Sequence, residues 1–326
     1  MEVYLFGCKD TSLHISKFLN RQGVDINLIT IDVELAKKNE VAGYINLQDF
    51  PQYFKSIYVA KSYSLKDSND INYFTKQANC SLGFCIGWQR LIPPSVLDNF
   101  NFGILGMHGS ARDLPFGKGR SPMNWSIIEG RKFFHTNLFR YQAGIDNGPV
   151  LDKAIFSINS SDTAETMHFK NVVAMTDLIN RNISKLFSNN AQYKNQTTDK
   201  AETFYPKRSP ADGIIDWSDD IYNMERLIRA VAPPFYGAIG IINRNEIIIS
   251  RASIFYTDVE THPFLEYSHG EILEIFPNNK FLVRCSNGVL LVHEYEGENF
   301  DLGDSFELKE SPYVNFERNV HGFFDT

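Results

Sequence analysis

The first two hundred residues alternate short apolar runs with longer polar segments. The runs VYLFG, INLIT, SIYVA, LGFCIGW and FGILGMH have the length and composition of buried strands. The segments between them, such as TSLHISKFLN and DINYFTKQANC, have helical character. This alternation predicts an α/β domain with a mainly parallel sheet and helices on both of its faces. A longer helix is expected from about 163 to 187, begun by a capping box of Asp162 and Glu165.

The pattern changes after residue 203. The polar segment before this point has the composition of a linker or surface loop. It is followed by a short helix around MERLIRAVA and by the runs IGII, EIIIS, GEILEI, KFLVRC and VLLVHEY, which Asn, Gly and Pro turns separate. Short strands at regular spacing are typical of a small barrel. We therefore expect a first domain over 1–203 and a β-barrel domain over 204–326.

Composition places the chain among globular proteins. It has 326 residues, of which 43% are hydrophobic and 22% charged, and no apolar run approaches the roughly 20 residues that span a bilayer. The opening MEVYLFGCKD lacks the features of a signal peptide, so a cytoplasmic location is expected. The cysteines Cys8, Cys80, Cys85 and Cys285 show no metal-binding spacing, which predicts reduced thiols and no metal site.

Charge is unevenly distributed. From residue 205 onward the chain has ten Lys and Arg against twenty Asp and Glu, a local net charge of −10. A surface of this sign repels polyanions, which argues against a nucleic acid as partner.

The candidate chemistry lies in GILGMHGSARDLPFGKGRSPMNW, residues 103 to 125. His108 ends an apolar run, so an open parallel sheet would place it at the carboxyl edge, where ligands bind. A packed structural histidine is the alternative. Lys118 and Arg120 lie in a glycine-rich loop, where they could grip a phosphate or a carboxylate or simply remain solvated. Asp146, in QAGIDNGPVL, could orient the imidazole or could be an ordinary turn residue.

The motifs MHGS, LP, KGRSP, W and IDNG, in this order and spacing, resemble the core of the 10-formyltetrahydrofolate-dependent N-formyltransferases. The later segments YPKRSPADGIIDW, IRAVAPPFYGA and GVLLVHEYEGE are similar to the barrel domain of methionyl-tRNA formyltransferases and several sugar formyltransferases. The resemblance implies a Rossmann-like formyltransferase domain followed by an OB-like barrel, and 10-formyltetrahydrofolate as formyl donor.

The resemblance also implies roles for individual residues. His108 and Asp146 match the catalytic His and Asp of the family. The folate would lie between two segments, one formed by Gln89, Arg90, Leu91 and Ile92 and the other by Ala143, Gly144 and Ile145. The acceptor would contact Gly106, Ser110, Lys118, Arg120 and Asn124.

Two departures from the family pattern stand out. Gly106 occupies the position of the asparagine whose amide would polarise the formyl carbonyl, and two residues are inserted between Ser110 and Leu114. Protonated His108, a backbone N–H, a water, Ser110 or Asn124 could supply the missing hydrogen-bond donor. The sequence does not choose among them.

The leading interpretation is a sugar N-formyltransferase that acts on the amino group of a nucleotide-linked amino sugar. The acidic second domain disfavours the first alternative, a methionyl-tRNA formyltransferase, because a tRNA requires clustered Lys and Arg. The second alternative is a non-catalytic folate- or nucleotide-binding relative, and a formyltetrahydrofolate hydrolase is disfavoured by the barrel. No membrane partner is expected, and a homodimer is possible.

Overall fold

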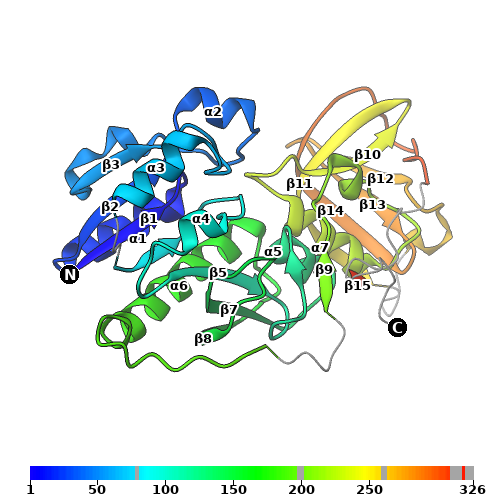
Figure 1. Cartoon of the computed structure of the whole chain (residues 1–326). Helices are drawn as coiled ribbons and strands as arrows, with labels where there is room; N and C mark the ends of the chain where they lie inside the picture. Colours follow the sequence, from blue (N-terminus) through cyan, green and yellow to red (C-terminus); the bar gives the residue numbers. More distant parts are fainter. Residues whose placement is uncertain (78–80, 197–201, 258–262, 309–317, 320–326) are drawn as a thin grey trace.

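The computed structural model describes residues 1–77, 81–196, 202–257, 263–308 and 318–319 (Figure 1). Its first unit is built on a seven-stranded sheet. The strands are β1 (Glu2–Phe6), β2 (Asp25–Thr30), β3 (Ser56–Val59), β4 (Gly83–Cys85), β5 (Ile104–Ser110), β7 (Phe133–Arg140) and β8 (Val150–Ser157). Their order is β3-β2-β1-β4-β5-β7-β8. The first five strands in this order pair in parallel, β7 pairs antiparallel with β5, and β8 pairs antiparallel with β7, so the prediction of a parallel-rich sheet is confirmed.

Helices cover both faces of this sheet. Successive side chains of β1 point to opposite faces, so each face presents apolar side chains to its own set of helices. Val3 and Leu5 pack with the helices α1 (Asp10–Arg21) and α6 (Ala164–Phe187), while Phe6 packs with α3 (Ser68–Lys76) and α4 (Pro94–Leu97). The shorter helices of the unit are α2 (Val33–Lys38), η1 (Leu47–Asp49) and η2 (Pro51–Tyr53).

The long helix α6 lies where the sequence predicted it, but its capping box is different. Thr163 is the N-cap, and the box pairs it with Thr166. The predicted box of Asp162 with Glu165 is wrong because the helix begins one residue later. Asp162 instead accepts hydrogen bonds from Thr166, from the Asn159 backbone and from Lys170.

In the described residues, the second unit is a five-stranded antiparallel sheet with one α-helix and two short 3-10 helices. Its elements are η3 (Pro210–Gly213), α7 (Ile221–Val231), β10 (Ala238–Ile242), β11 (Asn245–Thr257), η4 (Pro263–Glu266), β12 (Ile272–Phe276), β13 (Lys280–Cys285) and β14 (Gly288–Glu296). The order is β10-β11-β14-β13-β12. The segment 304–307 links the edges, because the Glu307 N–H donates to Ile241 O (2.7 Å) and the Ile272 N–H to Asp304 O (2.8 Å). The sheet therefore curves around one core, as predicted for a small barrel.

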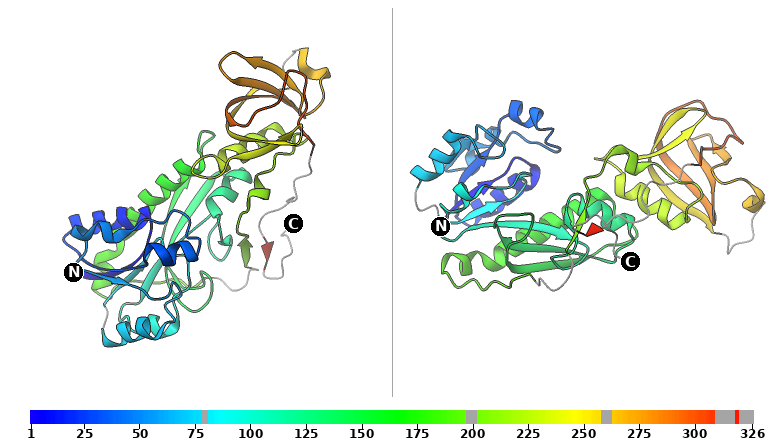
Figure 2. Two further views of the ribbon diagram at one scale, coloured as in Figure 1. Left: turned by 90° about the horizontal axis from the view of Figure 1, so that it is seen from above. Right: turned by 45° about the vertical axis from the view of Figure 1, so that its right-hand side comes forward.

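Elements that follow His108 in the chain join the two units. A small sheet combines β6 (Lys118–Gly119), β9 (Thr203–Tyr205) and β15 (Arg318–Asn319), and the helix α5 (Pro122–Ile128) packs on α7 (Figure 2). The Asn124 amide donates to Ala230 O (2.7 Å), and Trp125 Nε1 donates to Pro206 O (3.0 Å). Helix α5, which follows the loop beside the candidate site, is thus anchored on the second unit. The boundary near residue 203 stays a prediction.

Cys8, Cys85 and Cys285 are buried, and Cys80 lies outside the described residues. Within the described part of the chain, no helix is long and apolar enough to cross a membrane. The same residues contain no group of three or more His, Cys, Asp and Glu that could hold a metal ion.

Candidate active site

The candidate site lies on β5, between the ends of β4 and β7. His108 is 8% exposed. It follows Gly106 by two residues, so both positions belong to the same face of the strand. The register pairs Gly106 with Cys85 of β4, and β7 is the neighbour on the other side. The segments that leave β4 and β7 therefore flank this part of β5.

Both ring nitrogens of His108 have a partner. Nε2 lies 2.8 Å from the Gly117 carbonyl oxygen, and Nδ1 lies 3.3 Å from Asp146 Oδ2. A carbonyl oxygen only accepts hydrogen bonds, so this geometry assigns a proton to Nε2. Nδ1 faces the Asp146 carboxylate, which accepts a hydrogen bond from it when Nδ1 carries a proton. The pair can act as an acid or a base.

The turn that carries Asp146 is held from several sides. Asp146 has a positive φ of 49°, an uncommon conformation for a non-glycine residue. The Gln196 amide donates to the carbonyl oxygens of Asp146 (2.6 Å) and Gly148 (2.8 Å), and the Gly119 N–H lies 3.4 Å from Asp146 Oδ2. These contacts fix the carboxylate opposite His108.

Lys118 supports the same turn. Its side chain is fully buried, and its ammonium donates to Asn147 Oδ1 (2.9 Å) and Glu202 Oε1 (2.8 Å). Arg120, in contrast, is exposed and lies close to Lys9. Burial, together with the Arg120 charge, lowers the pKa of Lys9. The substrate contacts of Lys118 and Arg120 stay predictions, as does that of Asn124, whose amide binds Ala230.

We expect Lys118→Met to loosen the Asp146 turn. The change leaves Asn147 and Glu202 without their donor, which should lower the free energy of unfolding by about 1–3 kcal/mol. Misplacement of the carboxylate should lower kcat roughly 10- to 100-fold. Lys55→Met, which removes an exposed lysine paired with Glu2, is the control for thermal unfolding and steady-state kinetics. An unchanged kcat would contradict this role.

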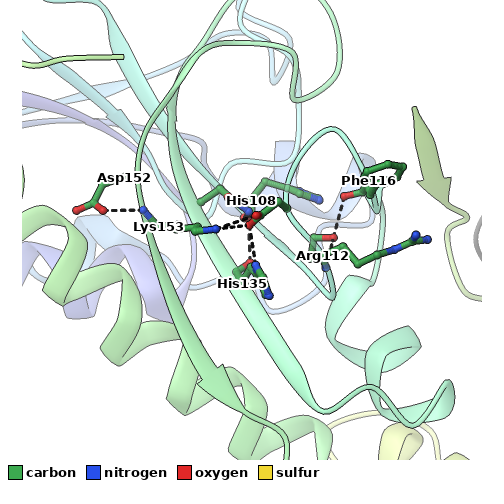
Figure 3. Close-up of polar contacts among 9 residues, drawn as sticks. His108, Arg112, Phe116, His135, Asp152 and Lys153 are labelled. Carbon is green, nitrogen blue, oxygen red and sulfur yellow. Dashed lines mark hydrogen bonds and ion pairs between the residues drawn. The ribbon is translucent and has the colours of Figure 1, made fainter. Parts of the chain in front are cut away.

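Residues 111–113, which contain the two-residue insertion, fold onto neighbouring strands. Asp113 Oδ1 lies 2.8 Å from His135 Nδ1, and the Lys153 ammonium binds both carboxylate oxygens at 2.7 and 2.8 Å. Figure 3 shows the side chains of His135 and Lys153 pointing towards the same place. Buried Ser110 donates to Phe116 O (2.8 Å) and accepts from the Arg112 N–H (3.2 Å). Sequence reasoning missed this anchor because His135 and Lys153 are distant in the chain. The acceptor contact of Ser110 stays a prediction.

Asp113 should make the stability of this loop depend on pH. Partial burial opposes ionisation, but hydrogen bonds from Lys153 and His135 outweigh it and lower the pKa of Asp113 below its ordinary value of 3.8. A lowered pKa stabilises the fold above the ordinary value, and the contribution disappears as the pH falls through the lowered pKa. The difference in Tm between the wild type and Asp113→Asn should be constant above about pH 5 and shrink towards pH 3. A pH-independent difference in thermal melts would contradict this.

The two predicted folate-binding segments lie on either side of β5. The Gln89 N–H donates to the Tyr63 hydroxyl (2.8 Å), and the Arg90 guanidinium lies 5.5 Å from the Tyr63 ring centre. Ile92 is buried, whereas Leu91 is 58% exposed. In the opposite segment Ala143 and Gly144 are exposed and Ile145 is 47% exposed. Each segment thus offers one exposed aliphatic side chain, and the folate contacts of all seven residues stay predictions.

Two family models match the chain. The formyl transferase model matches residues 31–177, and the model of the formyl transferase C-terminal domain matches residues 207–300. Together they cover well over half of the chain.

Among curated proteins, the chain is 29% identical over 178 residues to the bifunctional polymyxin resistance protein ArnA of Wigglesworthia glossinidia brevipalpis. The match covers 55% of this chain and 27% of that relative, so the chain spans much less than the relative's whole length.

Solved structures share the fold. WlaRD, a sugar 3N-formyl transferase determined in the presence of dTDP and 5-N-formyl-THF, aligns with a TM-score of 0.63 and 18% identity over 92% of this chain and 99% of that one. A methionyl-tRNA formyltransferase from Clostridium thermocellum aligns with a TM-score of 0.55 and 20% identity over 78% and 94%. At these identities the alignments establish the fold and leave the acceptor open.

Proposed function

The chain belongs to the formyl transferase family, and we propose that it transfers a formyl group from 10-formyltetrahydrofolate to the amino group of a nucleotide-linked amino sugar. The observation that carries the proposal is the pairing of His108, on β5 between the two predicted folate-binding segments, with Asp146 in the turn after β7. Formyl transfer needs a base for the attacking amine and a positioned formyl carbonyl. The His108–Asp146 pair would provide the base, and the folate held beside it would position the carbonyl.

In the proposed reaction the acceptor nitrogen attacks the formyl carbon, and the bond between that carbon and N10 of the folate then breaks. The amine proton passes to the His108–Asp146 pair, while Nε2 keeps its hydrogen bond to Gly117 O. Asp146 stabilises the imidazolium. N10 leaves with a proton, which His108 can return, so the histidine ends in its starting form.

The donor is placed by the two segments that flank β5. Leu91 and Ile145 offer apolar surface for the pteridine, and the segment 89–92 is held by the Tyr63 hydroxyl. WlaRD was determined with a formylated tetrahydrofolate, which supports a folate donor here.

Charge supports the choice of acceptor. Exposed Arg120 lies beside Lys9, so a local positive charge can meet a pyrophosphate. The chain from residue 205 has a net charge of −10, which opposes binding of a tRNA. WlaRD is a sugar 3N-formyl transferase determined with dTDP, which makes dTDP-linked amino sugars the first acceptors to examine.

We expect the full chain, incubated with 10-formyltetrahydrofolate and a panel of nucleotide-linked amino sugars, to add one formyl group to at least one of them. The measurement is mass spectrometry of the nucleotide sugar, with the His108→Ala variant as control. Formylation of charged initiator tRNA alone would show that the chain is a methionyl-tRNA formyltransferase and would overturn the proposed sugar acceptor. Folate binding without transfer to any amine would favour a non-catalytic relative.

A further inference from the structure

Tyr141 occupies the space that Gly106 leaves free. A Cβ atom built on Gly106 would lie 1.9 Å from Cε1 and 2.6 Å from Cζ of Tyr141. Real Cβ atoms do not approach other atoms this closely, so the phenol ring stands directly against the glycine. The ring therefore fills the position in which the family pattern places an asparagine side chain.

The ring is held in this position. Tyr141 follows β7, and its backbone N–H donates to Ile104 O (2.8 Å). Its ring packs against Phe139 with 5.3 Å between the ring centres. Its hydroxyl lies close to the Cys85 thiol, and Cys85 is the register partner of Gly106. The phenol therefore crosses β5 towards β4, on the face of β5 that Gly106 and His108 share.

The environment keeps this hydroxyl protonated. Burial, the neighbouring Cys85 and the negative charge of Asp146 raise the pKa of Tyr141 well above its ordinary value. Burial also raises the pKa of Cys85, to about 12, so its partner is a neutral thiol. A thiol is a weak hydrogen-bond acceptor. A carbonyl oxygen or an oxyanion within reach would be a much stronger one.

From this geometry we propose that the Tyr141 hydroxyl donates the hydrogen bond to the formyl oxygen, in place of the side-chain amide that Gly106 lacks. The phenol stays protonated throughout. It polarises the carbonyl, stabilises the oxyanion of the tetrahedral intermediate and is released when the carbonyl forms again. His108 and Asp146 remain responsible for the amine proton. This role rests on the proposed formyl transfer.

The kinetic test is Tyr141→Phe, which keeps the ring that covers Gly106 and removes the oxygen atom. We expect kcat to fall roughly 10²–10³-fold, the effect of losing one oxyanion donor, with the KM for the folate and the Tm little changed. Tyr58→Phe is the matched control. Tyr58 lies on β3, far along the sheet, and its partly buried hydroxyl donates to Asp70 (2.9 Å) in α3. A Tyr141→Phe enzyme with wild-type kcat would show that the ring only packs, and would overturn the proposal.

A second measurement does not depend on the acceptor. The wild type and Tyr141→Phe are compared with bound 10-formyl-5,8-dideazafolate, labelled with ¹³C in the formyl group, by difference infrared spectroscopy. A hydrogen bond from Tyr141 should give the formyl C=O stretch a lower frequency in the wild type than in the variant. Equal frequencies, or no binding by the wild type, would overturn the role of Tyr141. If the frequencies differ but no amino sugar is formylated, the role of Tyr141 stands and the proposed acceptor fails.

Discussion

Replacing His108 by alanine is expected to lower kcat roughly 10²–10⁴-fold, the usual effect of losing a positioned acid or base. The imidazole is 8% exposed and contacts Gly117 and Asp146 through its two nitrogens. No other described histidine is paired with Asp146. The measurement is steady-state formyl transfer with saturating folate.

The matched control is His135→Ala. His135 lies on the neighbouring strand and also pairs with an aspartate, Asp113, but through the inserted loop. It should lower the Tm and leave kcat nearly unchanged. Comparable losses of kcat in both variants would mean that His108 acts through the fold, and the assignment of the proton transfer would fail.

Asp146→Asn should lower kcat by less than His108→Ala. The variant retains an oxygen that can face Nδ1 but loses the charge that stabilises the imidazolium. The measurement is steady-state kcat of Asp146→Asn beside that of His108→Ala. A wild-type kcat in Asp146→Asn would leave Asp146 with a structural role only.

The sequence predicted the parts of the fold that local pattern determines. The apolar runs correspond to the strands β1 to β5, and the long amphipathic segment corresponds to α6. The cap of α6 was predicted one residue too early, because Asp162 and Thr163 both have side chains that can accept a backbone hydrogen bond. Only the structure shows which of them is the N-cap.

In the candidate site, too, the sequence predicted some residues and missed others. Motif order brought His108 and Asp146 into one hypothesis, and the structure places them 3.3 Å apart. The burial of Lys118 and its pairing with Glu202 were not predicted. The sequence places Lys118 in a glycine-rich loop, and only the structure shows Glu202 beside it. Tyr141 was missed for a similar reason. Tyr141 lies 35 positions after Gly106 in the chain, just beyond β7. Only the pairing of β5 with β7 brings the two residues together.

Gly106→Asn gives the second large expected effect, and it is a loss. The family pattern suggests that the restored amide would accelerate the reaction, but a Cβ at this position meets the Tyr141 ring at 1.9 Å. The ring is flanked by Phe139 and Cys85 and follows a hydrogen-bonded backbone, so displacing it should cost folding stability. Such overpacking typically costs about 1–3 kcal/mol of stability. We expect a lower Tm and, because the phenol hydroxyl is displaced, a kcat lowered roughly 10²-fold or more.

The double variant Gly106→Asn/Tyr141→Ala separates the clash from the chemistry. Removing the ring makes room for the asparagine, so the double variant should regain Tm relative to Gly106→Asn alone. If the amide and the phenol serve the same formyl oxygen, the double variant should also turn over roughly 10- to 100-fold faster than Tyr141→Ala, because one oxyanion donor has been restored. The comparison requires kcat and Tm for all three variants. A Gly106→Asn enzyme faster than the wild type would show instead that the glycine leaves the natural site without a donor, and that the ring of Tyr141 only fills space.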